Sequence, residues 1–205
     1  MLEAISLGCR RGERKLFSEL SLSLNSGQLL HVQGTNGSGK TSLLRILAGL
    51  SRQDAGKIFW NNTDIHTMYD EYASSLLYLG HQPAVKDDLT VTENLLVSAQ
   101  IGGVNPTSDA LKSAIEIVGL SRQANLPARV LSQGQRRRLA LARLWLGHKP
   151  LWILDEPFTA LDVEATTLLE ARLDAHLAIG GMVVLTTHQS PSITESYLCV
   201  LRLEP

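Results

Sequence analysis

One run of residues in the chain has the types and spacing that suit the binding of a polyphosphate. Residues 34–41 read GTNGSGKT, which fits the pattern G-x-x-x-x-G-K-[ST]. Glycines let the backbone wrap around an anion so that successive N–H groups point inward, and a helix starting near Lys40 adds the positive end of its dipole. Lys40 supplies a cation for the outer phosphates, and the Thr41 hydroxyl is placed to coordinate Mg²⁺.

This phosphate loop is predicted in the context that its pattern requires, because an apolar strand, LLHV at 29–32, precedes it and a leucine-rich helix follows it. The alternative is a chance glycine-rich turn between a strand and a helix. The predicted phosphate-binding residues are Gly34, Thr35, Asn36, Gly37, Ser38, Gly39, Lys40, Thr41 and Ser42.

A pair of carboxylates follows another apolar run, LWILDEP at 151–157. Ligands of parallel sheets bind at the carboxyl ends of the strands, where Asp155 and Glu156 are expected to lie. Asp155 can hold the Mg²⁺ of a nucleotide, and Glu156 can orient or deprotonate the attacking water. By itself such a pair could be a solvated strand end, but the phosphate loop upstream favours the catalytic interpretation.

Two further polar residues stand at predicted strand ends. His188 follows MVVLTT and can hydrogen-bond a γ-phosphate, while Gln82 follows LLYLG and can contact the metal or the water. Taken alone, each is more often a satisfied surface polar group than a catalytic one. Ser132 precedes a helix whose start is a potential anion site, although an ordinary N-cap explains the same residue. Most of the run Arg136–Arg138 is expected on a solvated helix face.

These residues need an α/β fold to bring them together. Segments 2–7 and 16–24 alternate apolar and polar residues and predict N-terminal antiparallel strands. Continuous apolar runs at 29–32, 76–80, 151–155 and 182–188 predict central strands of a parallel sheet covered on both faces, and 197–203 predicts an edge strand. Helices are predicted at 40–47, 91–101, 108–118, 133–146 and 163–179. We expect one domain, 1–205, with a core of 1–82 and 131–205 and a small helical subdomain at about 83–130.

The totals exclude several classes of protein. Apolar residues make up 44% and charged residues 19% of the 205, with a net charge of −1, so a general nucleic-acid binder is not expected. Cys9 and Cys199 have no metal or redox spacing and are expected to be buried thiols. Neither a signal peptide nor an apolar run of about 18 residues is present, so we expect a cytoplasmic protein that reaches a membrane only through partners.

The order of the motifs resembles that of the ATP-binding subunits of ABC transporters. It consists of the phosphate loop, Gln82, LSxGQ at 131–135, ILDEP, TALD at 159–162 and His188. The resemblance implies an ATPase with a P-loop fold that closes as a head-to-tail homodimer on ATP. It implies that Ser132 and Gly134, with Gln133 and Gln135 beside them, contact the γ-phosphate held by the loop of the second copy. It also places Asp162 at the dimer seam and makes Gln82 the residue that reports to a membrane subunit through the helical insertion.

Two positions depart from that family's usual pattern. Gln133 stands where the signature LSGGQ has a glycine, although the serine before it and the glycine after it are kept. Arg11 stands where an aromatic residue usually stacks on adenine. Because a guanidinium plane can stack on a base, we expect Arg11 to take that role.

A narrower resemblance is visible in LYLGHQPAVKDDLTVTENL, LARLWL, LWILDEPFTALD and LTTHQ. These segments are similar to the ATP-binding subunits of bacterial haem exporters of cytochrome c maturation. The resemblance implies integral membrane partners, a place on the cytoplasmic face of the inner membrane, and ATP hydrolysis linked to release of the haem-loaded periplasmic chaperone. No direct haem binding is expected, because the chain has no Cys-x-x-Cys-His.

Other functions remain open at this point. An ABC-type ATPase without a membrane partner would act in translation or DNA repair, and an ABC ATPase could also serve another transported substrate. A GTPase would need a guanine-reading N-K-x-D, which the chain lacks. A regulatory subunit that binds nucleotide without turnover would not need Glu156 and His188.

Overall fold

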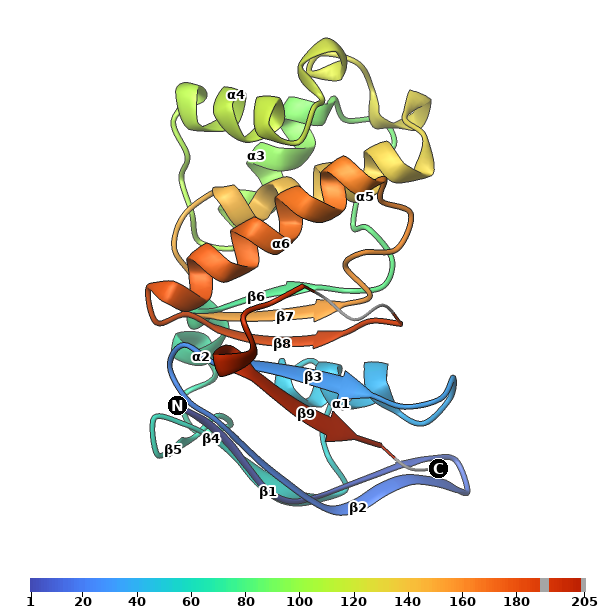
Figure 1. Ribbon diagram of the computed structural model, residues 1–205, viewed down its shortest axis with the longest axis vertical. Helices are drawn as coiled ribbons and strands as arrows, with labels where there is room; N and C mark the ends of the chain where they lie inside the picture. The colour runs from blue at the N-terminus through green and yellow to red at the C-terminus, as the bar shows by residue number, and fades with distance from the viewer. Residues whose placement is uncertain (189–191, 204–205) are drawn as a thin grey trace. The chain divides into compact units, whose positions relative to one another are not determined.

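The computed structural model describes residues 1–188 and 192–203 (Figure 1). The chain forms two compact units. The first comprises residues 1–78, 149–156 and 173–205, and the second comprises residues 79–148 and 157–172. Each unit has a hydrophobic core of its own.

An antiparallel sheet belongs to the first unit. Its four strands, in the order β2-β1-β4-β5, are β1 (Leu2–Arg11), β2 (Arg14–Leu24), β4 (Ala55–Trp60) and β5 (Thr63–Asp64). The predicted pairing of the first two strands is confirmed, with Leu2 opposite Leu24. Leu22 and Leu24 are buried and Ser21 and Ser23 are exposed, so β2 buries one face of the sheet and leaves the other in water.

A sheet with parallel pairing carries the polar strand ends. Its strands are β6 (Leu76–Leu79), β7 (Leu151–Asp155), β8 (Met182–Thr186), β3 (Leu29–Gln33) and β9 (Leu198–Arg202), in the order β6-β7-β8-β3-β9. β3 is parallel to both β8 and β9, and β7 is parallel to β8. Every residue of β7 and β8 is buried, as the continuous apolar runs predict. Because the carboxyl ends of parallel strands share one edge, the residues that follow β3, β7 and β8 meet there.

Two helices complete the centre of the first unit. α1 (Lys40–Leu47) contacts β7 and β8 and buries Leu43, Leu44, Ile46 and Leu47. α2 (Tyr69–Ser75) buries Tyr72, whose hydroxyl donates a 2.5 Å hydrogen bond to the Leu47 carbonyl. That bond satisfies a carbonyl in the last turn of α1, which has no partner within the helix.

The second unit is helical. It contains α3 (Val91–Ile101), α4 (Ser108–Ile117), α5 (Gln133–Leu141) and the 3₁₀ turns η1 (Ser121–Gln123), η2 (Ala128–Val130) and η3 (Ala142–Trp145). Its core is formed by aliphatic residues such as Leu95, Leu111 and Leu139. The expected helical subdomain, about 83–130, lies within this unit, which also contains residues 131–148 and 157–172.

Hydrogen bonds from side chains explain where α3 begins and where α5 ends. Thr90 and Glu93 form a capping box at the start of α3. The predicted helix 133–146 is wrong at its end, because α5 stops at Leu141 and continues as η3. The Leu144 carbonyl accepts hydrogen bonds from Nε and Nη2 of Arg172, at 3.0 and 2.7 Å, instead of a bond from a further helical turn.

The last elements are α6 (Val163–Ala178), which contributes residues to both units, and the 3₁₀ turn η4 (Glu195–Tyr197) before β9. In the described part of the chain, no helix combines the length and the apolar character needed to cross a membrane.

Candidate functional site

The glycine-rich bend connects β3 to α1 in the first unit. Gly39 is the N-cap of α1 with φ 102°, a left-handed conformation that side chains other than glycine rarely adopt. A Cβ atom on Gly34 would lie 2.5 Å from the Ser38 Oγ and 2.8 Å from the Leu203 carbonyl oxygen, so the backbone could not follow its path with a larger residue. No acidic residue occupies the first turn of α1. The N–H groups and the dipole of this helix therefore remain available to an anion.

Two side chains of the bend belong to its interior. The Lys40 ammonium donates to the carbonyl oxygens of Gly34 at 2.7 Å and Thr35 at 3.2 Å, which ties the end of the bend to its beginning. Ser38 is 2% exposed, and within the described residues its Oγ has no hydrogen-bond partner. A buried hydroxyl of this kind calls for a polar partner, which a phosphate oxygen would supply.

The Asp155 carboxylate lies at the end of β7 and is 1% exposed. Its Oδ2 accepts a 2.9 Å hydrogen bond from the Thr41 hydroxyl, and its Oδ1 accepts a 2.7 Å bond from the Thr186 hydroxyl. The fold therefore brings the predicted pair Thr41 and Asp155 into contact across 114 positions of sequence.

The donors at this edge suit Mg²⁺, because a hydroxyl and a carboxylate are the hard oxygen ligands that it prefers. Among the side chains that the structure describes, no group of three or more His, Cys, Asp and Glu residues could hold a metal ion. A magnesium ion beside Asp155 would therefore need further oxygen ligands from a nucleotide and from water.

The Glu156 residue has an unusual backbone. Its φ is 52°, a left-handed conformation that costs a residue with a side chain free energy and is found disproportionately at functional sites. Its N–H donates to the hydroxyl and the carbonyl of Thr186, at 2.9 and 3.2 Å. The Glu156 side chain is 13% exposed, and its Oε1 lies 3.5 Å from Nε2 of His188, which is 63% exposed. The two predicted catalytic side chains are therefore neighbours.

Arg11 lies at a hollow that begins beside the start of α1. This hollow of about 410 Å³ is lined by Cys9, Arg10, Arg11, Thr41, Ser42, Arg45, Ile46, Ser51 and Arg52. Thr41 and Ser42 of the first turn of α1 line the same hollow as Arg11. Cys9 is buried, and burial, with a smaller effect from the Asp54 carboxylate, raises the pKa of its thiol.

The remaining predicted residues belong to the second unit. Gln82 is exposed and follows β6 in the chain. Ser132 is the N-cap of α5: its hydroxyl accepts from the Gln135 N–H at 3.2 Å, and the Gln135 side-chain oxygen accepts from the Ser132 N–H at 2.9 Å. Gln133 is exposed beside this capping box. A Cβ on Gly134 would lie 2.9 Å from the Ala160 carbonyl, so this glycine lets the segment 159–162 approach the start of α5.

Comparison with known proteins assigns the chain to a family. Residues 17–159 match the family model described as ABC transporter. The chain belongs to the ABC transporter family. As a member, it is an ATP-binding domain that hydrolyses ATP, and the predicted fold class is confirmed.

Named relatives and solved structures of this family resemble the chain over most of its length. "Cytochrome c biogenesis ATP-binding export protein CcmA" of Nitrosomonas europaea is 54% identical over 92% of the chain and 89% of that protein. The protein of the same name in Escherichia coli K12 is 48% identical over 96% and 93%. A putative ABC transporter ATP-binding protein from Pyrococcus furiosus has a TM-score of 0.84 at 23% identity, covering 98% and 96%. A dimeric ATP-binding cassette bound to ADP and Pi has a TM-score of 0.80 at 21% identity, covering 100% and 97%.

One buried arginine of this ABC domain is not predicted by the sequence. Arg137 is 4% exposed, whereas most of its run was expected on a solvated face. Its Nη1 donates to the carbonyls of Gly80 at 3.1 Å and His81 at 3.4 Å, and its Nε donates to the Pro157 carbonyl at 3.3 Å. Arg137 thus joins the backbone just before Gln82 to the backbone just after Glu156. Its position four residues before the buried Leu141, on the same helix face, was the available signal.

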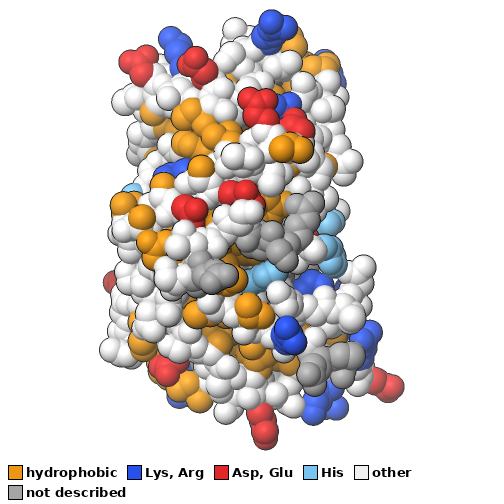
Figure 2. All heavy atoms as spheres, in the orientation of Figure 1, with side chains coloured by type: hydrophobic (Ala, Val, Ile, Leu, Met, Phe, Trp, Pro, Cys, Tyr) orange, Lys and Arg blue, Asp and Glu red, His pale blue; other side chains and the backbone are white. Residues whose placement is uncertain are grey.

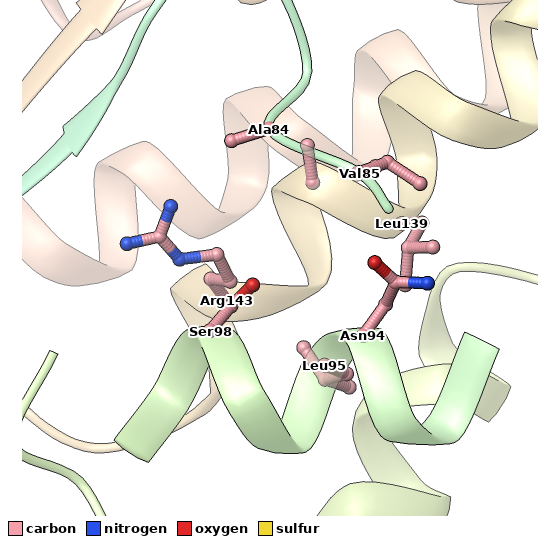
Figure 3. A pocket seen from close by; sticks show the side chains of 8 residues that line it. Ala84, Val85, Asn94, Leu95, Ser98, Leu139 and Arg143 are labelled. Carbon is pink, nitrogen blue, oxygen red and sulfur yellow. The ribbon is translucent and has the colours of Figure 1, made fainter. Parts of the chain in front are cut away.

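A narrow hollow opens in the helical unit, close to Gln82 in the chain (Figure 3). It is lined by Ala84, Val85, Asn94, Leu95, Ser98, Leu139, Ala140 and Arg143. Asn94 fixes the neighbouring loop, because its side-chain amide donates to the carbonyls of Lys86, Leu89 and Thr90 and its oxygen accepts from the Lys86 N–H. Burial lowers the pKa of the Arg143 guanidinium.

Proposed function

We propose that the chain is the ATP-hydrolysing subunit of an ABC complex of cytochrome c maturation, a haem-export system, and that its hydrolysis drives release of the haem-loaded periplasmic chaperone. The observation that supports this system is the 48–54% identity, over nearly the full length, to relatives named as cytochrome c biogenesis export proteins. The contact between Thr41 and Asp155 beside Glu156 and His188 supports hydrolysis at this site.

The phosphates of ATP are held by the loop Gly34–Thr41 and the first turn of α1 with Ser42. The Lys40 ammonium has three donors and can exchange loop carbonyls for phosphate oxygens. Thr41 and Asp155, with Gln82 assisting, would hold Mg²⁺, which when bound neutralises charge on the phosphates. The buried hydroxyl of Ser38 can donate to a phosphate oxygen held by the same loop.

Glu156 acts on the attacking water. Its carboxylate accepts a hydrogen bond from that water and takes one of its protons as the water oxygen bonds to the γ-phosphorus. The bond from the γ-phosphorus to the bridging oxygen breaks in the same step, and ADP leaves with the electron pair of that bond. His188, whose Nε2 lies 3.5 Å from the Glu156 carboxylate, orients that carboxylate and hydrogen-bonds the γ-phosphate. The low exposure of Glu156 limits competition from bulk water for the same oxygen atoms.

The competent form is a homodimer that closes on ATP. Ser132, Gln133, Gly134 and Gln135 of one copy face the nucleotide of the other, and Asp162 lies at the seam. The capping box of Ser132 and Gln135 keeps the N–H groups of α5 in place for that contact. Arg11 stacks on the adenine in the hollow beside α1.

The partners are integral membrane subunits, which hold the chain at the cytoplasmic face of the bacterial inner membrane. The membrane subunits sense the nucleotide through Gln82 and through the hollow in the helical unit that Ala84 and Val85 help to line. The chain itself binds no haem and no nucleic acid. On the face that Figure 2 shows, basic and acidic side chains are interspersed, which does not suit a nucleic-acid surface.

Purification of the tagged chain from detergent-solubilised membranes tests the proposal. We expect integral membrane proteins to co-purify and the complex to release phosphate from ATP only when Mg²⁺ is present. Recovery of ribosomes or DNA instead of membrane proteins would favour an ABC ATPase without a membrane partner. Absence of phosphate release would favour a regulatory subunit.

A further inference from the structure

A buried hydroxyl on β8 contacts both the Asp155 carboxylate and the Glu156 backbone. Thr186 is the last residue of β8 and is 0% exposed. The register places it directly opposite Asp155 on β7 and opposite Val32 on β3. The other four residues of β8 are Met182, Val183, Val184 and Leu185, so Thr186 is its one polar residue.

The hydroxyl of Thr186 acts both as a hydrogen-bond donor and as an acceptor. It donates to Oδ1 of Asp155 at 2.7 Å and accepts from the N–H of Glu156 at 2.9 Å. Since the hydroxyl has a single proton, the bond to Asp155 fixes its orientation and turns a lone pair toward Glu156. The result is a directed chain of hydrogen bonds from the Glu156 N–H through Thr186 to the Asp155 carboxylate, in which each bond polarises the next.

These hydrogen bonds constrain the Asp155 carboxylate and the Glu156 backbone. Thr41 already holds Oδ2 of Asp155, so the bond from Thr186 to Oδ1 fixes the rotation of the carboxylate. On the other side, the Thr186 hydroxyl and carbonyl both accept from the Glu156 N–H and hold that residue at φ 52°. A left-handed residue persists only where its surroundings impose the conformation.

We propose that Thr186 is a positioning residue for ATP hydrolysis, which sets the direction of the Asp155 carboxylate and the backbone of Glu156 through one hydroxyl. The inference rests on the proposed roles of those two residues. Packing alone does not require threonine here, because valine would fill the same volume and match the rest of the strand. The distinguishing feature of Thr186 is therefore the pair of hydrogen bonds and not its shape.

Thr186→Val removes the hydroxyl at nearly constant volume, and Thr186→Ser keeps it. In the complex purified from membranes, we expect Thr186→Val to lower the rate of Mg²⁺-dependent ATP hydrolysis by about 10–100-fold, the usual effect of losing a group that orients a metal ligand. Thr186→Ser should hydrolyse ATP within about threefold of the wild-type rate. Thr63→Val, a change at an exposed threonine of β5, is the matched control and should have the wild-type rate.

Calorimetry with ATP separates positioning from a merely structural role. Without Mg²⁺, the phosphate loop binds ATP alone, and Thr186→Val should bind it as the wild type does. With Mg²⁺, the gain in ATP affinity seen for the wild type should shrink in Thr186→Val and return in Thr186→Ser. An equal loss of ATP affinity with and without Mg²⁺ would show that the hydroxyl only supports the fold and would overturn the inference.

The outcomes also separate this inference from the proposed function. A wild-type hydrolysis rate in Thr186→Val overturns the inference alone. Absence of ATP hydrolysis by the wild-type complex overturns the proposed function and the inference with it. If Thr186→Val does not fold, Thr186→Cys, whose thiol is only a weak donor, takes its place, and wild-type turnover by that variant overturns the inference.

Discussion

Arg137 offers a sharp test of the packing of the helical unit, because it is the buried member of three consecutive arginines. Arg137→Met keeps the length and volume of the aliphatic stem but removes the guanidinium. The carbonyls of Gly80, His81 and Pro157 then lose a donor, and water can replace it only in part, because the bond to Pro157 is buried and the other two are partly buried. We expect the variant to be destabilised through these three carbonyls.

The magnitude follows from the hydrogen-bond lengths. The bond to Gly80 is 3.1 Å long and those to Pro157 and His81 are 3.3 and 3.4 Å, so the latter two are weaker than average. At about 1 kcal/mol for each ordinary bond, and somewhat more for a charged donor, the loss is about 2–4 kcal/mol. For a chain of this size, 1 kcal/mol corresponds to roughly 2–4 °C, so the melting temperature should fall by about 5–15 °C.

Arg136 next to it provides the matched control. Its Nη1 pairs with the Asp87 carboxylate at 2.5 Å, but the side chains are 26% and 61% exposed. An ion pair open to solvent contributes at most about 1 kcal/mol, so Arg136→Met should melt within about 4 °C of the wild type. Thermal and urea denaturation followed by circular dichroism measure both variants. Equal destabilisation by the two changes, or a wild-type melting temperature for Arg137→Met, would refute the assignment of these bonds.

Three other changes test the nucleotide site and the core. Glu156→Gln should keep ATP binding but lower phosphate release by about 10²–10⁴-fold, because an amide cannot take the proton of water. The variant should also elute as a dimer with ATP in size-exclusion chromatography. Wild-type turnover by this variant would show that Glu156 has no role in the mechanism. Lys40→Ala should weaken ATP binding at least tenfold in calorimetry and change the melting temperature little, and unchanged binding would contradict the phosphate-loop assignment. Burial raises the pKa of the Tyr72 phenol, so the folded state holds its proton more tightly than the unfolded state does, and stability should fall as the pH rises above about 10. Tyr72→Phe should lose about 1 kcal/mol at pH 7 but show a smaller decline between pH 10 and 12 in urea titrations; equal declines would contradict the burial of an un-ionised phenol.

Elements with complete local signals are predicted well. α1 starts at Lys40 and α3 spans Val91–Ile101, as expected, because a glycine or a capping box marks the start of each. By contrast, β4 and α2 were not predicted. β4 has only six residues, AGKIFW, and it forms a strand because β1 pairs with it across about 50 residues of sequence. Such a partner is invisible to a reading of neighbouring residues.

The residues of the candidate site likewise divide into those that the sequence predicts and those that it does not. Sequence motifs predict the phosphate loop, Asp155, Glu156 and His188, because each motif places particular residue types at the end of a strand. No motif predicts the contacts of Thr186 and Arg137. Thr186 lies 31 positions from Asp155, and Arg137 lies 57 positions from Gly80. Only the register of β7 with β8 and the position of α5 bring these partners together. A threonine that ends an apolar strand and an arginine in a basic run look ordinary until these contacts are known.

The strand order has a consequence for biosynthesis. β3 carries the nucleotide loop, yet both of its neighbours, β8 and β9, lie about 150 residues or more further along the chain. At a translation rate of about 5–20 residues per second, the ribosome needs roughly 8–30 s to deliver β8 after β3 has been made. During that interval the strand has neither of its final hydrogen-bonding partners. The ATP-binding site is therefore completed late in synthesis. A nascent chain stalled before residue 182 should not retain the nucleotide.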